Sequence, residues 1–121
     1  MSINEILDYC RDAIERSKSL VHDMQKFIQD NIINNITVFT VAEHFKLTPG
    51  YVGKIYKKET GKKLIDYILE VKMEKAKELL KKGGIKVEDI ATLLGYSQPL
   101  NFRKQFKRFT GYTPSEFIRR K

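Results

Sequence analysis

Residues 38–61 read VFTVAEHFKLTPGYVGKIYKKETG, and residues 87–111 read VEDIATLLGYSQPLNFRKQFKRFTG. The second stretch repeats the first, with one residue inserted after its central Ser97. The matched pairs are Ala42 with Ala91, Leu47 with Tyr96, Thr48 with Ser97, Val52 with Phe102, Lys54 with Lys104, Tyr56 with Phe106, Lys57 with Lys107, and Thr60-Gly61 with Thr110-Gly111. A short helix, a tight turn and a longer helix ending in glycine are the sequence shape of a helix-turn-helix. A plain helical bundle with duplicated hairpins would explain the repeat equally well.

Helical periodicity continues on both sides of the repeat, and strand-like alternation is absent. Thr48 before Pro49 suits a helix start, and Gly61 suits the left-handed residue past a helix end. Thr40 stands where an acidic partner of the Thr37 cap is usual, so we expect an incomplete capping box. We predict helices over residues 1–30, from Thr37 through Phe45, over 49–60, 63–82 and 87–94, from a Ser97 cap to 110, and from Thr113-Pro114 onward. The sequence therefore predicts an all-α fold with seven helices, in which two helix-turn-helix subdomains are joined by a long central helix and preceded by an N-terminal linker helix.

One side of each longer helix in the repeat carries cations without carboxylates. Successive residues turn by about 100°, which gives each helix an apolar inner side and a polar outer side. We expect Val52, Ile55, Tyr56, Phe102, Phe106 and Phe109 to be buried, and Gly50, Lys54, Lys57, Lys58, Leu100, Lys104, Lys107 and Arg108 to face outward. A solvated helix usually mixes charges so that neighbouring side chains attract one another. Two single-sign faces at matching positions indicate a surface that meets phosphates.

The net charge of +8 is concentrated in the second half of the chain. Residues 1–60 hold 8 Lys or Arg against 8 Asp or Glu, whereas residues 61–121 hold 15 against 7. This bias favours a polyanionic partner such as DNA, RNA or an anionic lipid surface, although a merely soluble basic protein remains an alternative. The predicted helix over 63–82 would be about 30 Å long, and equivalent major-groove sites lie about 34 Å apart in B-DNA. That match favours two recognition helices on successive major grooves.

The two halves also carry a specific family pattern. The segment GYSQPLNFRKQFKRFTGYTPSEF, residues 95–117, with VAEHFKLTPGYVGKIYKKETG before it, resembles the DNA-binding domain of the AraC/XylS family of transcription regulators. The resemblance covers about residues 20–120. It implies a linker or signalling helix over 1–18 and a DNA-binding domain over 19–121, in which a connecting helix at about 63–82 joins helix-turn-helix units at about 37–61 and 86–111.

By position, the resemblance implies two groups of DNA contacts. The base-facing residues are Gly50, Tyr51, Lys54, Pro99, Leu100, Asn101 and Lys104, and the phosphate contacts are Lys57, Lys58, Lys107 and Arg108. Gly50 and Gly53 depart from the family pattern, because recognition-helix positions usually carry side chains. Glycine has no atoms to read bases and weakens a helix interior by roughly 1 kcal/mol relative to alanine. We expect the first unit either to read sequence poorly or to order fully only on DNA.

Residues 1–30 carry an apolar seam with alternating spacings of four and three residues, typical of a coiled coil. The seam positions are Ile3, Leu7, Cys10, Ile14, Ser17, Val21, Met24 and Ile28, and Ile6, Ala13, Leu20 and Phe27 widen the stripe. The helix could simply pack on the first unit, or it could dimerise and couple to an upstream sensor. The stretch resembles the connector between a receiver and its output domain in some response regulators. This implies a sensory or receiver domain upstream, so we expect an excised or naturally separate output domain.

Other classes of function have little support in the sequence. The His, Cys and carboxylate residues form no catalytic or metal-binding pattern, so we expect no enzyme, metal site or cofactor. No apolar run is long enough to cross a membrane, and the first 20 residues lack the apolar middle of a signal peptide, so we expect a cytoplasmic protein. The expected partners are double-stranded DNA, with RNA polymerase as a further candidate and a homodimer through residues 1–30. RNA is disfavoured because exposed aromatic stacking platforms are not evident. The main alternative is a helical protein-interaction module whose basic face binds an acidic protein.

Overall fold

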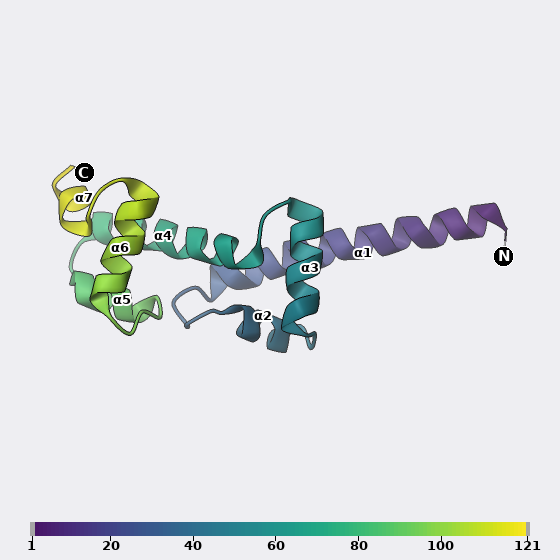
Figure 1. Ribbon diagram of the computed structural model, residues 1–121, viewed down its shortest axis with the longest axis horizontal. Coiled ribbons are helices and arrows are strands. Elements are labelled where there is room, and N and C mark those ends of the chain that lie inside the picture. The colour runs from purple at the N-terminus through teal and green to yellow at the C-terminus, as the bar shows by residue number, and fades with distance from the viewer. Residues whose placement is uncertain (1, 121) are drawn as a thin grey trace.

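The computed structural model describes residues 2–120, and every regular element in that range is a helix (Figure 1). The helices are α1 (Ile3–Asp30), α2 (Val38–His44), α3 (Pro49–Thr60), α4 (Leu64–Lys82), α5 (Val87–Leu93), α6 (Pro99–Thr110) and α7 (Pro114–Arg120). The predicted all-α, seven-helix fold is therefore confirmed. The pairs α2–α3 and α5–α6 form the two helix-turn-helix units, with α4 between them.

Local chemistry sets the ends of the first unit's helices. Thr48 accepts a hydrogen bond from the Tyr51 N–H at the start of α3, and Gly61 closes that helix with a φ of +77°. Our expectation for Thr37 was wrong, because the capping box is complete. The Thr40 hydroxyl accepts a hydrogen bond from the Thr37 N–H at 2.8 Å, as an acidic side chain at this position usually does.

The start of α6 differs from our prediction. Its N-cap is Gln98 rather than Ser97, and no side chain caps the helix. The inserted residue is the cause. Pro99 fixes the first helical position, and the residue before a proline is held in an extended conformation. Ser97 therefore lies one residue too early to bond the first turn.

The core of the molecule runs along α4. This helix contacts α1 and α3 from the first half of the chain and α5, α6 and α7 from the second half. The buried residues of α4 are Leu64, Tyr67, Ile68, Met73, Ala76 and Leu80. In the first unit the Tyr67 ring stacks on Tyr56, with centroids 5.6 Å apart. In the second, Phe102 and Phe106 are fully buried.

Phe109 was predicted to be buried but is 41% exposed. The inner position in the last turn of α6 belongs instead to Thr110, which is half-buried. The Thr110 hydroxyl donates to the Phe106 carbonyl at 2.8 Å and accepts the Tyr112 N–H. The helix ends at Thr110, and Gly111 turns the chain with a φ of +88° directly after Phe109 and Thr110.

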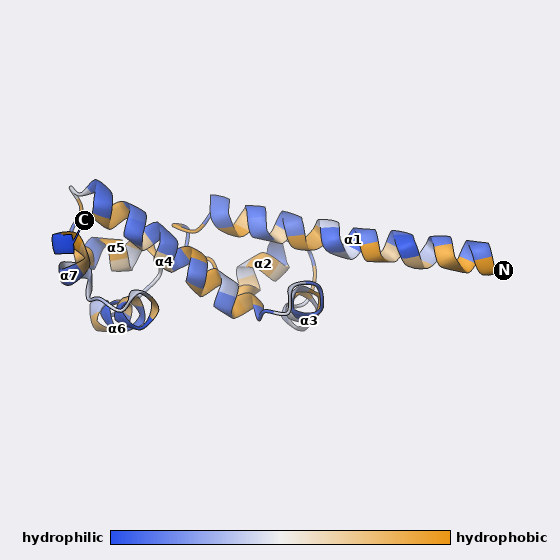
Figure 2. Cartoon of the chain, turned by 90° about the horizontal axis from the view of Figure 1, so that it is seen from above, coloured by the Kyte–Doolittle hydropathy of each residue, from blue (hydrophilic) through white to orange (hydrophobic). Residues whose placement is uncertain are grey.

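The C-terminal half of α1 is anchored to the first unit. Its buried residues are Val21, Met24 and Ile28. Gln25 donates a hydrogen bond to the Tyr56 hydroxyl at 3.2 Å, and Gln29 donates to the Tyr67 hydroxyl at 2.8 Å. The N-terminal half of α1 projects away from the rest of the chain (Figures 1 and 2).

We predict that Gly53→Ala stabilises the fold by about 0.5–1 kcal/mol, because glycine weakens a helix interior and an added methyl group at this position meets no atom within 4 Å. Urea unfolding followed by circular dichroism measures the change. Gly61→Ala is the matched control, and it should destabilise by about 1–2 kcal/mol because its φ of +77° disfavours a side chain. A loss of stability in Gly53→Ala would show that this helix position is more crowded than described.

Candidate nucleic-acid interface

The longer helices of the two units, α3 and α6, lie on the same face of the molecule. Seen from above, both are viewed nearly end-on along one edge, while α1 runs along the other (Figure 2). In the view of Figure 1 they run in similar directions, separated along the length of α4. The face that bears α3 and α6 is called the recognition face below.

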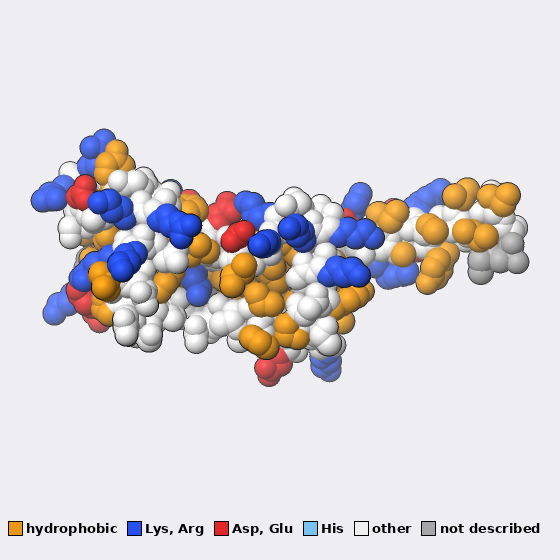
Figure 3. Space-filling model, viewed as in Figure 1, with side chains coloured by type: hydrophobic (Ala, Val, Ile, Leu, Met, Phe, Trp, Pro, Cys, Tyr) orange, Lys and Arg blue, Asp and Glu red, His pale blue; other side chains and the backbone are white. Residues whose placement is uncertain are grey.

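The structure places almost all predicted contact residues at the surface of α3 and α6. Tyr51 is 49% exposed and Leu100 is 55% exposed, and only Pro99 is partly covered. The other exposed members are Gly50, Lys54, Lys57, Lys58, Asn101, Lys104, Lys107 and Arg108. Lys and Arg side chains are visible over both helices on this face (Figure 3). The predicted residues, apart from Pro99, are therefore accessible on two helices that lie on one face of the molecule.

The recognition face is rich in unneutralised positive charge. Within residues 2–120, none of Lys54, Lys57, Lys58, Lys104, Lys107 and Arg108 takes part in an ion pair. The only carboxylate on α3 is Glu59, which is half-buried, and α6 has none. Because these cations take part in no ion pair, they can contact phosphates without first losing one, so this surface suits a polyanion.

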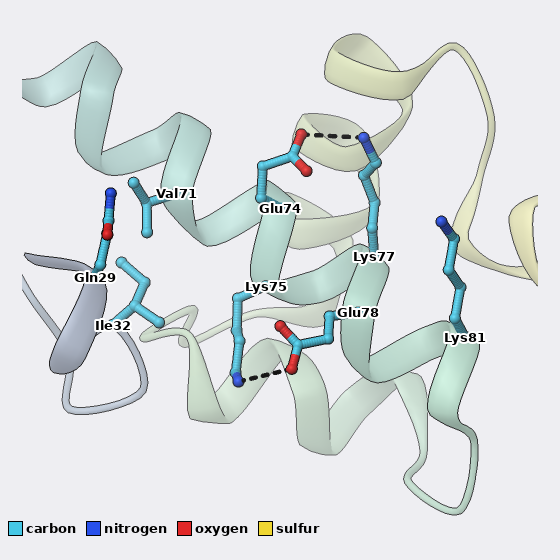
Figure 4. Close-up of a pocket in the computed structure, with 8 residues that line it drawn as sticks. All are labelled: Gln29, Ile32, Val71, Glu74, Lys75, Lys77, Glu78 and Lys81. Atoms are coloured by element: carbon cyan, nitrogen blue, oxygen red, sulfur yellow. Dashed lines mark hydrogen bonds and ion pairs between the residues drawn. The ribbon is translucent and has the colours of Figure 1, made fainter.

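The pocket between the end of α1 and α4 has the opposite character (Figure 4). There Glu74 pairs with Lys77 at 3.0 Å, and Glu78 pairs with Lys75 at 3.3 Å. Its charges are largely balanced within the pocket. The contrast shows that the single-sign charge belongs to the exposed side chains of α3 and α6 and is not a general property of this basic chain.

One feature of the recognition helices was not predicted. Arg103 of α6 pairs with Glu88 of α5, which ties together the helices of the second unit. The two residues lie on different helices, so the periodicity within one helix could not predict their ion pair. In the first unit, α3 is helical from Pro49 to Thr60 despite its two glycines.

The two units meet where the turn of the second touches the loop between α1 and α2. Gly95 has a φ of +89°, and a methyl group added to it would overlap the Asn35 side-chain oxygen. The matching turn residue of the first unit is Lys46, which has a φ of +58°. A side chain is therefore compatible with this turn geometry, and the neighbouring Asn35 adds a second reason for glycine at position 95.

A half-buried lysine also lies at this junction. Lys72 of α4 places its Nζ 5.6 Å from the centroid of the Tyr96 ring, and burial lowers the pKa of its ammonium group. The groove around it includes Thr37 and Val38 of the first unit and Gln105 of the second. Residues of both units thus line one shallow groove between α2 and α6.

Other kinds of site find no support in the part of the chain that is described. Among residues 2–120, no group of three or more His, Cys, Asp or Glu side chains could hold a metal ion. Within the same range, no helix has the length and apolar character needed to cross a membrane.

Comparisons with known proteins agree with this geometry. The profile of a helix-turn-helix domain family matches residues 41–120. The Msm operon regulatory protein of Streptococcus mutans is 29% identical over 111 residues, which cover 92% of this chain and 40% of that protein. This chain therefore spans less than half the length of that relative.

Solved structures show the same fold. The C-terminal domain of AraT, a response regulator from Geobacillus stearothermophilus, superimposes with a TM-score of 0.77 at 29% identity, covering 84% of this chain and 85% of that one. The DNA-binding domain of the global transcriptional factor AdpA, solved in complex with a target DNA, superimposes with a TM-score of 0.72 at 17% identity. The latter pair covers 81% of this chain and 88% of that one, and it is evidence for a shared fold.

We predict that Gly95→Ala destabilises the protein by about 1–3 kcal/mol, because the new methyl group is forced into an occupied space. Asn35→Gly removes the obstructing side chain, and glycine suits the φ of +56° at that position. The double variant should therefore recover part of the loss, as measured by urea unfolding in a double-mutant cycle. Lys46→Gly is the control for the turn geometry alone, because it removes the β-carbon at the matching turn position, where φ is +58°. Equal losses in the single and double variants would contradict the contact between Asn35 and Gly95.

Proposed function

Since this chain belongs to the AraC-type helix-turn-helix family of transcription regulators, we propose that it binds double-stranded DNA sequence-specifically, with α3 and α6 in successive major grooves. The observation that carries the proposal is the placement of two cation-bearing helices on one face. The connecting helix α4 has 19 residues and is about 28 Å long. That length supports a fit to major-groove sites about 34 Å apart on one side of B-DNA.

In this proposal the N-terminal part of α6 reads bases. Lys104 donates to guanine O6 or N7, Asn101 pairs with adenine, and Leu100 contacts a thymine methyl group. Pro99 fixes the start of the helix close to the base edges. These side chains differ from one another in chemistry, so they can distinguish among base pairs.

The first unit contributes mainly affinity and register. Tyr51 and Lys54 are its base-facing side chains, whereas Gly50 offers only backbone. Lys57 and Lys58 contact phosphates there, as Lys107 and Arg108 do in the second unit. Phosphate contacts position a protein on the duplex without reading its sequence.

We infer that the chain acts as the output part of a longer regulator. The Streptococcus mutans relative is more than twice as long as the matched region, and the AraT domain is the C-terminal part of a response regulator. An upstream sensory or receiver domain would then control DNA binding through α1. The regulator would act in the cytoplasm, where RNA polymerase is a further partner at the promoter.

We predict that Lys104→Ala weakens binding to the specific duplex by about 1–3 kcal/mol and relaxes preference at one base pair. Fluorescence-anisotropy titration against a duplex selected from a random pool, and against its scrambled form, measures both effects. Lys77→Ala is the control, because Lys77 is paired with Glu74 and lies outside the recognition face. Equal losses on the two duplexes would refute a base-reading role for Lys104.

Lys107→Ala should instead weaken binding to both duplexes alike, because a phosphate contact is independent of sequence. The slope of log K against log salt should become shallower by about 0.9 for one lost phosphate contact. Titrations at several salt concentrations measure this slope. If the unmodified chain binds neither duplex in these titrations, a protein-binding role for the basic face is favoured instead.

A further inference from the structure

The N-terminal half of α1 exposes an apolar stripe that no other part of the described chain covers. Ile3 is 75% exposed, Leu7 is 55% exposed and Ile14 is 51% exposed, whereas from Val21 onward the same seam is buried in the first unit. Soluble proteins rarely leave large contiguous apolar patches open to water. The same apolar seam is therefore buried in the core at the C-terminal end of α1 and exposed to solvent at its N-terminal end.

The projecting half of α1 has no tertiary contact to hold it helical. Isolated helices shorter than about 12–15 residues are marginal in water, so most helical stability comes from packing an apolar face. Its capping box between Ser2 and Glu5 sets the start of the helix but supplies no packing. The spacing of its apolar residues, alternating four and three, is that of a helix that packs along another helix.

We propose that the occupant of this stripe is a second copy of the same chain, in a parallel two-stranded coiled coil over residues 3–17. The stripe has one cationic flank, formed by Arg11 within residues 3–17 and by Lys18 directly after them, and one apolar flank, formed by Ile6 and Ala13. In a parallel pair each cationic flank lies against the apolar flank of the other helix, where the long aliphatic stems of Arg and Lys cover apolar surface. In an antiparallel pair over the same residues, the Arg11 side chains of the two copies would meet and repel each other.

Intrahelical pairing does not remove this directional preference. Arg11 is loosely paired with Asp8 at 3.8 Å, with both side chains 69% exposed. Such a surface pair is weak and leaves most of the arginine charge effective. Cys10 and Ser17 are small seam residues that bury little apolar area, so the association is reversible and depends on protein concentration.

A parallel pair has a direct consequence for DNA recognition, and this part rests on the proposed function. Both copies leave the coiled coil at the same end, so four recognition helices are delivered to one stretch of DNA. A duplex carrying two binding sites is then bound cooperatively, whereas a duplex with one site is bound without cooperativity. The pairing itself does not depend on DNA.

Sedimentation equilibrium on the full chain without DNA tests the pairing. The unmodified chain should shift from monomer to dimer as its concentration rises, and Leu7→Glu with Ile14→Glu should remain monomeric. Tyr9→Glu is the matched control, since Tyr9 is 66% exposed but lies off the seam, and it should dimerise like the unmodified chain. A monomer at all concentrations, a larger assembly, or a dimer that survives the double substitution would overturn the proposal.

Cross-linking tests the orientation. In the Cys10→Ser, Ser17→Cys variant, a short bis-maleimide should join the two copies, because identical positions of a parallel pair are adjacent. An antiparallel pair overlapping over residues 3–17 would separate the two cysteines by about 21 Å along the axis. A dimer that forms but does not cross-link would overturn the parallel arrangement. Loss of DNA binding with intact dimerisation would reject the proposed function and leave the pairing standing.

Discussion

The burial of α4 between the two units is the constraint on which the rest of the structure depends. This helix contacts α1 and α3 at one end and α5, α6 and α7 at the other. A helix with all its backbone hydrogen bonds formed bends little, so its length sets the spacing of the two units. The stacked rings of Tyr56 and Tyr67 then fix α3 against it. The recognition face exists because two small units, each too small for a large core, share one rigid element.

The two units follow the same plan but hold their helices together differently. In the second, Arg103 reaches across to Glu88. The corresponding residues of the first unit are Gly53 and Phe39, which cannot form such a pair, and Phe39 is 73% exposed. The second unit thus has both a tied pair of helices and a more varied set of outward side chains. The asymmetry agrees with the proposed function, in which α6 selects the base sequence and α3 mainly adds contacts to the DNA backbone.

Sequence reasoning succeeded where the determinants are local. Helix periodicity, the Thr48-Pro49 start and the Gly61 end depend on neighbouring residues, and the helices they predicted are present. It failed where the outcome depends on the end of a helix. Helical periodicity predicted that Phe109 is buried, but it takes no account of where α6 ends. The exposure of Lys54 and Lys104 was predicted from the helical periodicity of α3 and α6, whereas the common face of these two helices depends on how both pack on α4. The contact of Asn35 with Gly95 joins residues 60 positions apart, and no pattern within one helix encodes it.

The continuity of α1 links the outer seam to the recognition face. The helix is unbroken from Ile3 to Asp30, so a partner that binds its exposed half also sets the direction of its buried half. That buried half donates hydrogen bonds to Tyr56 of α3 through Gln25 and to Tyr67 of α4 through Gln29. A rotation of α1 about its axis must therefore either carry α3 and α4 with it or break these bonds and the packing of Met24 and Ile28. The upstream domain of the proposed function would therefore act on α3 through this one helix.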